Sequence, residues 1–293
     1  MKRLALILMT ACCAGAWAAG PKAPLVEGHR GSRGTMPEDT LPAFNEALRV
    51  GADVLELDMG VTKDGVVVIS HEPRVTPERC LGPDGKKLEK AIPIHSLTYA
   101  ELRRYDCGSL PNPKFPRQRQ VPGTPMPTLD EVFALVENST YPAAAAVQFN
   151  IETKIFPAEP GLTPPPAEFA ALVADVIKKH HMEKRVILQS FDVRTLKAMK
   201  KLLPQVRTAQ LTNDNLLDVV PALKAAGTDI WSPNSRWVTP ESVMEAHDAG
   251  IEVAPWTLNT PAEWDMAIGS GADAIITDYP EDLVKYLKAK KLR

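Results

Sequence analysis

The chain has 293 residues, of which 44 % are hydrophobic and 24 % are charged, and its formal net charge at pH 7 is −2. This length and composition predict a soluble globular protein with one barrel or two small domains. Lysines and arginines are dispersed along the chain, so no nucleic acid partner is expected, and the basic stretch 285–293 is interpreted as a solvated final helix.

The first residues, 1–18, have the pattern of a secretory signal peptide. Two basic residues precede a short apolar run, which ends in Ala-Trp-Ala at 16–18. We therefore predict cleavage after Ala18 and export to the periplasm. A lipoprotein acylated at Cys12 or Cys13 is the alternative. The apolar run is too short to span a membrane, and no later segment resembles a transmembrane helix, so no stable membrane insertion is expected.

Residues 19–293 are predicted to alternate between strands and helices. Helix ends are marked by glycine before a short apolar run, as at Gly51 and Gly271, and helix starts by threonine, as at Thr128 and Thr260. The predicted strands are 25–29, 53–59, 147–152, 186–190, 206–211, 229–232, 251–256 and 273–277. The predicted helices lie near 40–50, 128–138, 166–181, 193–203, 214–226, 240–249, 261–270 and 281–290. Eight alternating pairs predict an α/β fold, a closed TIM (β/α)8 barrel, whereas an open doubly wound sheet has no reason to stop at eight.

Residues 72–127 fit neither role and are predicted to form a small insertion subdomain between strand 2 and helix 2. They are rich in proline and contain the two cysteines that remain after signal peptide removal, Cys80 and Cys107. An even pair of cysteines in an exported protein favours a disulfide over a metal site.

A β-hairpin is predicted around Asp64-Gly65, which lie between two apolar runs. With these two residues as the loop, Asp58 lies opposite His71, with their β-carbons about 4.5 to 5.5 Å apart. Because side chains alternate along a strand, Glu56 and Asp58 share one face. That face is buried, and buried charge is costly unless it is paired or bound to a metal. The sequence therefore predicts a functional site here.

Polar residues also follow the first and third strands. His29 and Arg30 follow the first strand, and Glu152 and Lys154 alternate at the end of the third. These strand ends meet at the carboxyl-terminal mouth of a barrel. With the two acids of the second strand, Glu152 completes a set of three carboxylates without thiolates or clustered histidines, which predicts a hard divalent cation, Ca²⁺ or Mg²⁺.

The motifs around these residues resemble the glycerophosphodiester phosphodiesterase family, whose pattern is His-Arg-Gly, Pro-Glu-Asn-Thr, Glu-Leu-Asp and His-Asp. The matching stretches here are His29-Arg30-Gly31, Pro37-Glu38-Asp39-Thr40, Glu56-Leu57-Asp58 and His71-Glu72. The third strand similarly resembles the family's Asn-Ile-Glu-x-Lys motif, and the resemblance spans about residues 25–280. The chain departs from the pattern at Asp39 and Glu72, and neither residue is expected to touch the metal or histidine positions.

The resemblance implies metal-dependent hydrolysis of a small-molecule glycerophosphodiester to sn-glycerol 3-phosphate and an alcohol such as choline or ethanolamine. It implies that His29 and His71 are the general acid and base, in an order that the resemblance does not give. The implied metal ligands are Glu56, Asp58 and Glu152. Arg30 and Lys154 would bind the phosphate. Trp256, in a more weakly similar motif, would pack against the glycerol moiety or, alternatively, cap the core.

Two other functions remain possible from the sequence. One is a phospholipase D-like or phosphoinositide-type phosphodiesterase on the same barrel, which exposed aromatic residues in the insertion would support. The other is a non-catalytic periplasmic phosphodiester-binding protein, which the presence of both histidines disfavours, because a binding protein needs no acid–base pair. Water and the glycerol hydroxyl of the substrate both remain open as the nucleophile, and the sequence predicts no oligomeric state.

Overall fold

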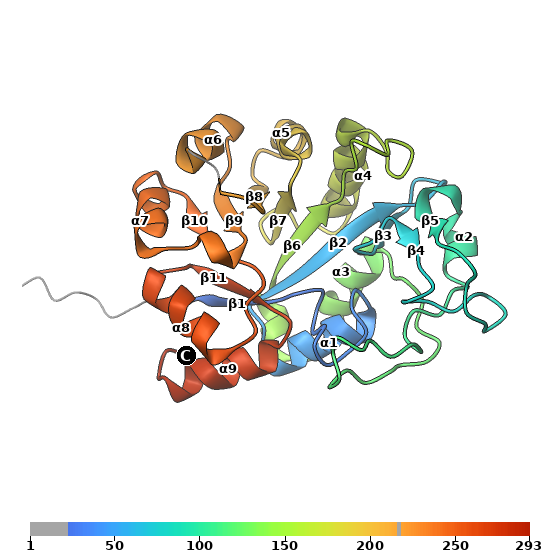
Figure 1. Cartoon of the computed structure of the whole chain (residues 1–293). Helices are drawn as coiled ribbons and strands as arrows, with labels where there is room; N and C mark the ends of the chain where they lie inside the picture. The colour runs from blue at the N-terminus through green and yellow to red at the C-terminus, as the bar shows by residue number, and fades with distance from the viewer. Residues whose placement is uncertain (1–22, 216–217) are drawn as a thin grey trace, which may run out of the picture.

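Eight parallel strands form the centre of the molecule (Figure 1). The computed structural model describes residues 23–215 and 218–293, so the predicted signal peptide at 1–18 lies outside the described residues. The strands are β1 (Leu25–Gly28), β2 (Val54–Val61), β6 (Gln148–Thr153), β7 (Val186–Ser190), β8 (Arg207–Thr212), β9 (Ile230–Pro233), β10 (Glu252–Val253) and β11 (Ala274–Thr277). They are hydrogen-bonded in the order β10-β9-β8-β7-β6-β2-β1-β11.

The two ends of this strand order meet. The N–H of Asp273 donates to the carbonyl of Val253 (2.9 Å), and the N–H of Ile276 donates to the carbonyl of Pro255 (3.1 Å). β10 is shorter than the predicted strand 251–256, because Pro255 has no N–H and interrupts the ladder. These bonds connect β11 and the residue before it to β10 and the segment after it, and the predicted TIM barrel is confirmed.

A helix follows each strand and covers the outside of the barrel (Figure 1). These helices are α1 (Leu41–Val50), α3 (Leu129–Glu137), α4 (Pro166–Lys179), α5 (Val193–Leu202), α6 (Val219–Ala226), α7 (Pro240–Asp248), α8 (Pro261–Ser270) and α9 (Pro280–Ala289). Thr128 and Thr260 form capping boxes at the starts of α3 and α8, and Gly51 and Gly271 end α1 and α8 with φ of 88° and 85°. Within the described ranges, no helix combines the length and apolar character needed to cross a membrane.

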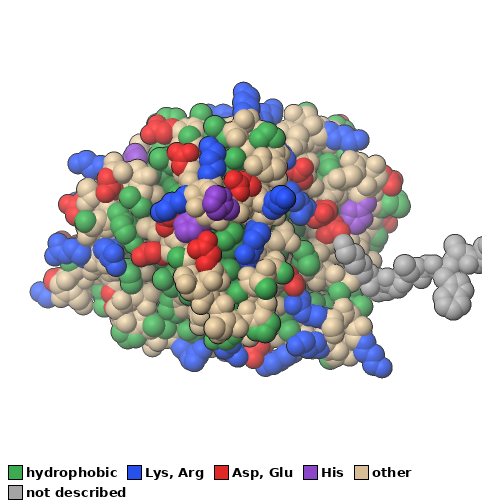
Figure 2. All heavy atoms as spheres, turned by 180° about the vertical axis from the view of Figure 1, so that it is seen from behind, with side chains coloured by type: hydrophobic (Ala, Val, Ile, Leu, Met, Phe, Trp, Pro, Cys, Tyr) green, Lys and Arg blue, Asp and Glu red, His purple; other side chains and the backbone are tan. Residues whose placement is uncertain are grey.

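The largest apolar cluster packs β2, β6 and β7 against α1, α3, α4 and α5, with Phe44, Phe133, Phe149 and Phe169 fully buried. A smaller cluster inside the barrel consists of Ile187, Ala209, Ile230, Ala254 and Ala274. These mostly small side chains fill the interior beneath the carboxyl ends of the strands and leave the mouth to polar groups. On the face drawn in Figure 2, acidic and basic side chains of the described residues are interspersed with hydrophobic ones.

Residues 72–127 lie beside the mouth of the barrel and carry their own elements: β4 (Arg74–Val75), β5 (Ile92–Pro93), the short 3-10 helix η1 (Ile94–Ser96) and α2 (Tyr99–Leu102). A separate buried cluster lies beneath them and includes Ile94 and Leu102. Cys80 and Cys107 form a disulfide, with their Cα atoms 4.0 Å apart. The segment leaves and rejoins the barrel at one place, since Val68 pairs with Thr128 in an antiparallel bridge.

The hairpin between β2 and β3 (Val67–Ile69) differs from the prediction by one residue. Met59 pairs with Ile69, so Asp58 lies opposite Ser70, whose N–H donates to the carbonyl of Asp58 (2.8 Å), and the predicted pairing of Asp58 with His71 is wrong. The loop has three residues, 63–65, and ends in Gly65 with φ of 79°. The hydroxyl of Thr62 accepts from the N–H of Val66 (3.0 Å), which stabilises this longer turn.

Candidate active site

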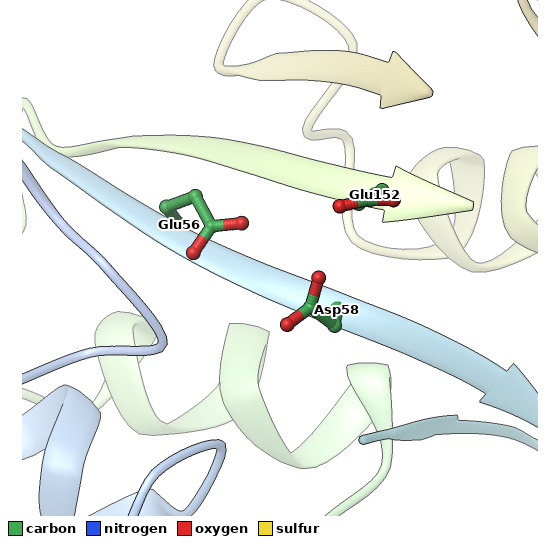
Figure 3. A group of neighbouring side chains, drawn as sticks. All are labelled: Glu56, Asp58 and Glu152. Atoms are coloured by element: carbon green, nitrogen blue, oxygen red, sulfur yellow. The ribbon is translucent and has the colours of Figure 1, made fainter. Parts of the chain in front are cut away.

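The three predicted metal ligands meet at the mouth of the barrel. Glu56 and Asp58 project from β2, and Glu152 projects from the neighbouring strand β6, where it pairs in register with Asp58 (Figure 3). One carboxylate oxygen from each residue lies within 4.8 Å of the others. All three residues are buried. The alternation of side chains along two paired strands therefore assembles the carboxylate set that the sequence predicts.

This carboxylate set carries more negative than positive charge. Burial raises the pKa of Glu152 to about 8, and burial together with the adjacent Asp58 raises the pKa of Glu56 well above its usual range. Lys154 supplies one ammonium group, which lies 3.0 Å from Asp58 Oδ1 and 2.8 Å from Glu152 Oε2. Asp58 Oδ2 is buried without a hydrogen-bond partner among the described residues. Lys154 and Arg30, whose Nε lies 3.1 Å from Asp58 Oδ2, supply two positive charges against three buried carboxylates, so this all-oxygen set fits a divalent cation.

His29 follows β1 and is held by residues from the last two barrel units. Its Nδ1 lies 2.6 Å from Asp278 Oδ1, and Asn259 Nδ2 donates to the other oxygen of Asp278 (2.7 Å). Burial opposes ionisation of Asp278, but the hydrogen bond from His29 lowers the pKa of this carboxyl. Burial lowers the pKa of His29 itself. The ionised Asp278 holds the ring proton on Nδ1, so Nε2, 4.0 Å from Glu56 Oε2, carries the free lone pair.

His71 follows β3 and is held by the two residues at which the chain departs from the family pattern. Its N–H donates to Asp39 Oδ2 (3.0 Å), and its Nδ1 lies 2.9 Å from Glu72 Oε1. The expectation that Asp39 and Glu72 touch no histidine position is therefore wrong. The loop after β1 brings Asp39, with φ of 56°, beneath His71, a contact that sequence spacing does not show. Burial lowers the pKa of His71, and the nearby Asp58 opposes that shift.

Arg30 joins the carboxylate set to a cluster of charges beside it. Its backbone N–H donates to Glu56 Oε2 (2.8 Å), its Nη1 donates to Glu38 (2.9 Å), and its Nε lies 3.1 Å from Asp58 Oδ2. Glu38 also contacts Arg33 and Arg79. Burial opposes ionisation of Glu38, but these arginines lower its pKa to about 2. Glu38 thus fixes the position of the Arg30 guanidinium beside the carboxylate set.

All eight predicted site residues line one cavity of about 310 Å³: His29, Arg30, Glu56, Asp58, His71, Glu152, Lys154 and Trp256. The wall that includes Trp256 is largely apolar and contains Phe191, Leu211 and Ile276. The indole N–H of Trp256 donates to the carbonyl of Ser232 (2.9 Å), and its ring contacts that of Phe191 edge to face. A charged wall therefore faces an apolar one across the cavity.

Several residues of the site received no role from the sequence. Asp278 and Asn259 hold His29, Gln189 donates to Glu56 Oε1 (2.7 Å), and Arg33 lines the cavity. Asp278 and Gln189 lie at the ends of β11 and β7, and polar residues at the carboxyl ends of barrel strands are the signal that points to such roles. Arg33 lies within a loop, where no periodic pattern marks it.

Most of the chain is similar to proteins of one family. Residues 29–282 match the model of the Glycerophosphoryl diester phosphodiesterase family. The chain is 30 % identical over 266 residues to a glycerophosphodiester phosphodiesterase of Caldanaerobacter subterraneus, covering 90 % of this chain and 98 % of that relative. A relative of the same name from Bacillus altitudinis is 29 % identical over 265 residues, with 90 % and 98 % covered.

Solved structures show the same similarity. The crystal structure of a putative glycerophosphoryl diester phosphodiesterase from Silicibacter pomeroyi matches with a TM-score of 0.84 at 32 % identity, covering 93 % of this chain and 95 % of that one. The structure of a phosphodiesterase from Oleispira antarctica, in complex with the product sn-glycerol-3-phosphate, matches with a TM-score of 0.75 at 22 % identity, with 91 % and 97 % covered.

Proposed function

Because this chain belongs to the glycerophosphoryl diester phosphodiesterase family and is an enzyme of that class, we propose that His29 and His71 are its acid–base pair. The observation that carries this proposal is the placement of both rings in one cavity, each held through Nδ1 by a carboxylate. This arrangement leaves Nε2 of each ring for proton transfer. One ring takes the proton of the attacking oxygen, and the other gives a proton to the departing alcohol.

Glu56, Asp58 and Glu152 are proposed to bind one divalent cation, Ca²⁺ or Mg²⁺. Three buried carboxylates whose oxygens lie within 4.8 Å of one another support this, and burial raises the pKa of both Glu56 and Glu152. When bound, the cation would offset negative charge on the phosphate. Arg30 and Lys154 add fixed positive charge to the same wall and would orient the phosphate oxygens.

The apolar wall is proposed to receive the glycerol moiety. Trp256 and Ile276 line it, and their contact with the carbon chain would exclude water from that side of the phosphate. The proposed products are sn-glycerol 3-phosphate and the alcohol of the head group. The Oleispira antarctica relative, whose structure holds sn-glycerol-3-phosphate, supports the first product.

Turnover of deacylated phospholipids tests this function. The protein is treated with a chelator, and each diester is assayed after addition of Ca²⁺ or Mg²⁺. We expect release of sn-glycerol 3-phosphate only when a divalent cation is restored. Binding of the diesters without any product, in the presence of either cation, would contradict catalysis and support the binding-protein alternative.

The periplasm is the proposed location, and 1–18 the signal peptide that directs export there. The disulfide between Cys80 and Cys107 supports an oxidising compartment. We expect the exported form to begin at Ala19, which intact mass spectrometry measures directly. A diacylglyceryl adduct on Cys12 would instead show a lipoprotein.

A further inference from the structure

A second hollow, of about 640 Å³, opens from the catalytic cavity toward the insertion. It shares Arg30, Arg33 and His71 with that cavity and continues past Arg79 to Lys114. We call it the basic hollow, defined by Arg33, Arg79 and Lys114. Because it begins at a proposed acid–base histidine, a group attached to the reacting phosphate can extend into it.

Arg33 is fixed at the junction of the two spaces. Its guanidinium lies 4.5 Å from the centre of the Phe115 ring, and its carbonyl accepts from Gln118 Nε2 (2.8 Å). Both of these partners belong to the insertion. Its Nε lies 3.1 Å from Glu38 Oε2 and 3.8 Å from Asp278 Oδ1. The side chain is therefore held in place before any ligand binds.

Arg33 contacts Glu38 as an ion pair, but its side chain has hydrogen-bonding capacity left. Within residues 23–215 and 218–293, none of its side-chain nitrogens donates a hydrogen bond, although its side chain is only 18 % exposed and Nε is buried. A guanidinium has five N–H donors in a planar fork that matches a carboxylate or phosphate. A half-buried guanidinium that donates no hydrogen bond to the described residues, on a preformed wall, is suited to an anionic ligand.

The acids of the basic hollow do not remove this preference. Glu38 is paired with Arg30, Arg33 and Arg79, and Glu72 contacts His71. The exposed Glu78 also lines the hollow, so three carboxylates face four side chains of fixed positive charge, which are Arg30, Arg33, Arg79 and Lys114. A third hollow that also borders His71 is smaller, about 230 Å³, and its charged lining residues are Glu72, Glu152, Asp192 and Lys154. Of the two spaces beside the reacting phosphate, the basic hollow is the one that favours negative charge.

We propose that the basic hollow receives the leaving alcohol of the substrate and that Arg33 there binds an anionic substituent, such as a carboxylate. The inference rests on the proposed function and deepens it. It makes Arg33 a specificity-determining residue that favours glycerophosphodiesters with a negatively charged head group. The phosphate itself remains with Arg30, Lys154 and the carboxylate set.

Glycerophosphoserine and glycerophosphoethanolamine provide the test, because they differ by a single carboxylate on the head group. The measured quantity is the ratio of kcat/KM for the serine diester to that for the ethanolamine diester. For Arg33→Met, we expect this ratio to fall about tenfold or more, as expected for loss of a charge-assisted hydrogen bond. Arg33→Lys should retain part of the preference, since it keeps the charge without the fork. The ratio cancels any general effect of Arg33 on His29.

Arg117→Met is the matched control. Arg117 also belongs to the insertion and lies over an aromatic ring, that of Tyr279 at 4.8 Å, but it pairs with Asp282 (2.5 Å) and is not among the residues that line the basic hollow. Its ratio should equal that of the unmodified protein. Lys114→Met, an exposed change at the far end of the hollow, should lower the ratio by about threefold and serves if Arg33→Met does not fold.

An unchanged ratio in Arg33→Met, or in Lys114→Met if Arg33→Met does not fold, would overturn the inference. Equal decreases in kcat/KM for both diesters would also overturn the inference, because they would show that Arg33 acts on the phosphate that both diesters share. Calorimetric binding of the two diesters to His29→Ala with Ca²⁺ makes the same comparison without turnover. Absence of turnover in the unmodified protein would count against the proposed function, whereas equal affinities in His29→Ala would count against this inference.

Discussion

The two proposed acid–base histidines have similar partners in different surroundings. His29 is held by buried Asp278, which Asn259 holds in turn, whereas His71 is held by Glu72, whose side chain is 48 % exposed. Water can replace an exposed partner more easily than a buried one. The orientation of the His29 ring should therefore depend strongly on Asp278, and the orientation of the His71 ring should depend less on Glu72.

Exchanging each histidine separates chemistry from metal binding. His29→Ala and His71→Ala should each lower turnover by roughly a hundred- to ten-thousandfold and still bind the cation. The turnover of the double variant should fall by a factor much smaller than the product of the two single-variant factors, because both residues act in one reaction.

Glu152→Gln should instead weaken cation affinity, with partial recovery of the turnover rate in excess cation. Turnover and bound metal are measured in the same samples, and near-normal turnover of metal-loaded His29→Ala would refute the assignment.

The supporting carboxylates give a sharper comparison. Asp278→Asn should lower kcat by about tenfold or more with little change in KM, because the amide no longer fixes the tautomer and orientation of His29. Glu72→Gln, an exposed partner change of the same kind, should lower kcat by less than about threefold. Steady-state kinetics over a range of pH checks both variants. Equal small effects would show that Asp278 has only a structural role.

The sequence pointed to the eight residues that line the candidate cavity but not to their supporting contacts. His29, Glu56, Asp58 and Glu152 follow from motif and strand alternation, which are local properties. The contacts of Asp278 with His29 and of Asp39 with His71 join positions 249 and 32 residues apart, and only the closed barrel and its loops bring them together.

At the level of elements, the hairpin shows where local rules fail. Asp64-Gly65 is a strong signal for a two-residue loop, but the hydroxyl of Thr62 bonds both Val66 N and Asp64 Oδ1, and a three-residue loop results. The register shifts by one, which places Ser70 opposite Asp58. His71 still lines the cavity, because it lies beyond the last paired residue of β3, Ile69.

The insertion depends on its cross-link. Cys80 and Cys107 are 27 residues apart, so chain entropy assigns the disulfide about 3 to 4 kcal/mol of stabilisation. Replacing both cysteines with serine should lower the free energy of unfolding of the insertion, while the barrel retains its circular dichroism. Limited proteolysis measures the opening of the insertion, and chemical denaturation followed by circular dichroism measures the stability of the barrel. Two reactive thiols per chain in denatured, unreduced protein would show that no bond exists in solution.

At the scale of the whole molecule, the barrel combines an apolar interior layer with a buried polar chain. Asn150 Nδ2 donates to Glu27 (2.9 Å) and to Gln189 (3.2 Å), and Gln189 donates to Glu56 (2.7 Å). This series of hydrogen bonds crosses the barrel interior from Glu27 on β1 to Glu56 in the carboxylate set. The alternation of strands and helices predicted the barrel, but it could not show that Glu27 faces inward, because a strand of four residues has too little pattern to fix its faces.

Glu27 should make stability depend on pH. Burial raises its pKa from 4.5 to about 7, so between these values the folded state keeps a proton that the unfolded state has lost. The free energy of unfolding should therefore decrease as pH rises through this window, by up to about 3 kcal/mol in total. Glu27→Gln removes the titrating carboxyl and with it this pH dependence. The free energy of unfolding of Glu27→Gln minus that of the unmodified protein should therefore rise by up to about 3 kcal/mol between pH 4.5 and 8.

Denaturation at saturating Ca²⁺ and several pH values measures the difference. Glu89→Gln, an exposed change in the insertion, is the control and should show no trend with pH relative to the unmodified protein. A Glu27→Gln variant that tracks the unmodified protein at every pH would show that this carboxyl is ionised at no cost inside the barrel.

The bridge between Val68 and Thr128 has a consequence for protein engineering. A segment whose two ends already touch can be exchanged for another of different length at a small cost in chain entropy, since that cost grows only slowly with loop length. Residues 72–127 of this chain could thus be transplanted onto the barrel of a relative as one cassette. Phe115, Gln118 and Lys114 would move with the cassette, whereas Arg33, both histidines and all three carboxylates of the β2–β6 set would stay behind, so the exchange would replace the insertion residues that hold Arg33 without replacing the proposed acid–base pair or metal ligands.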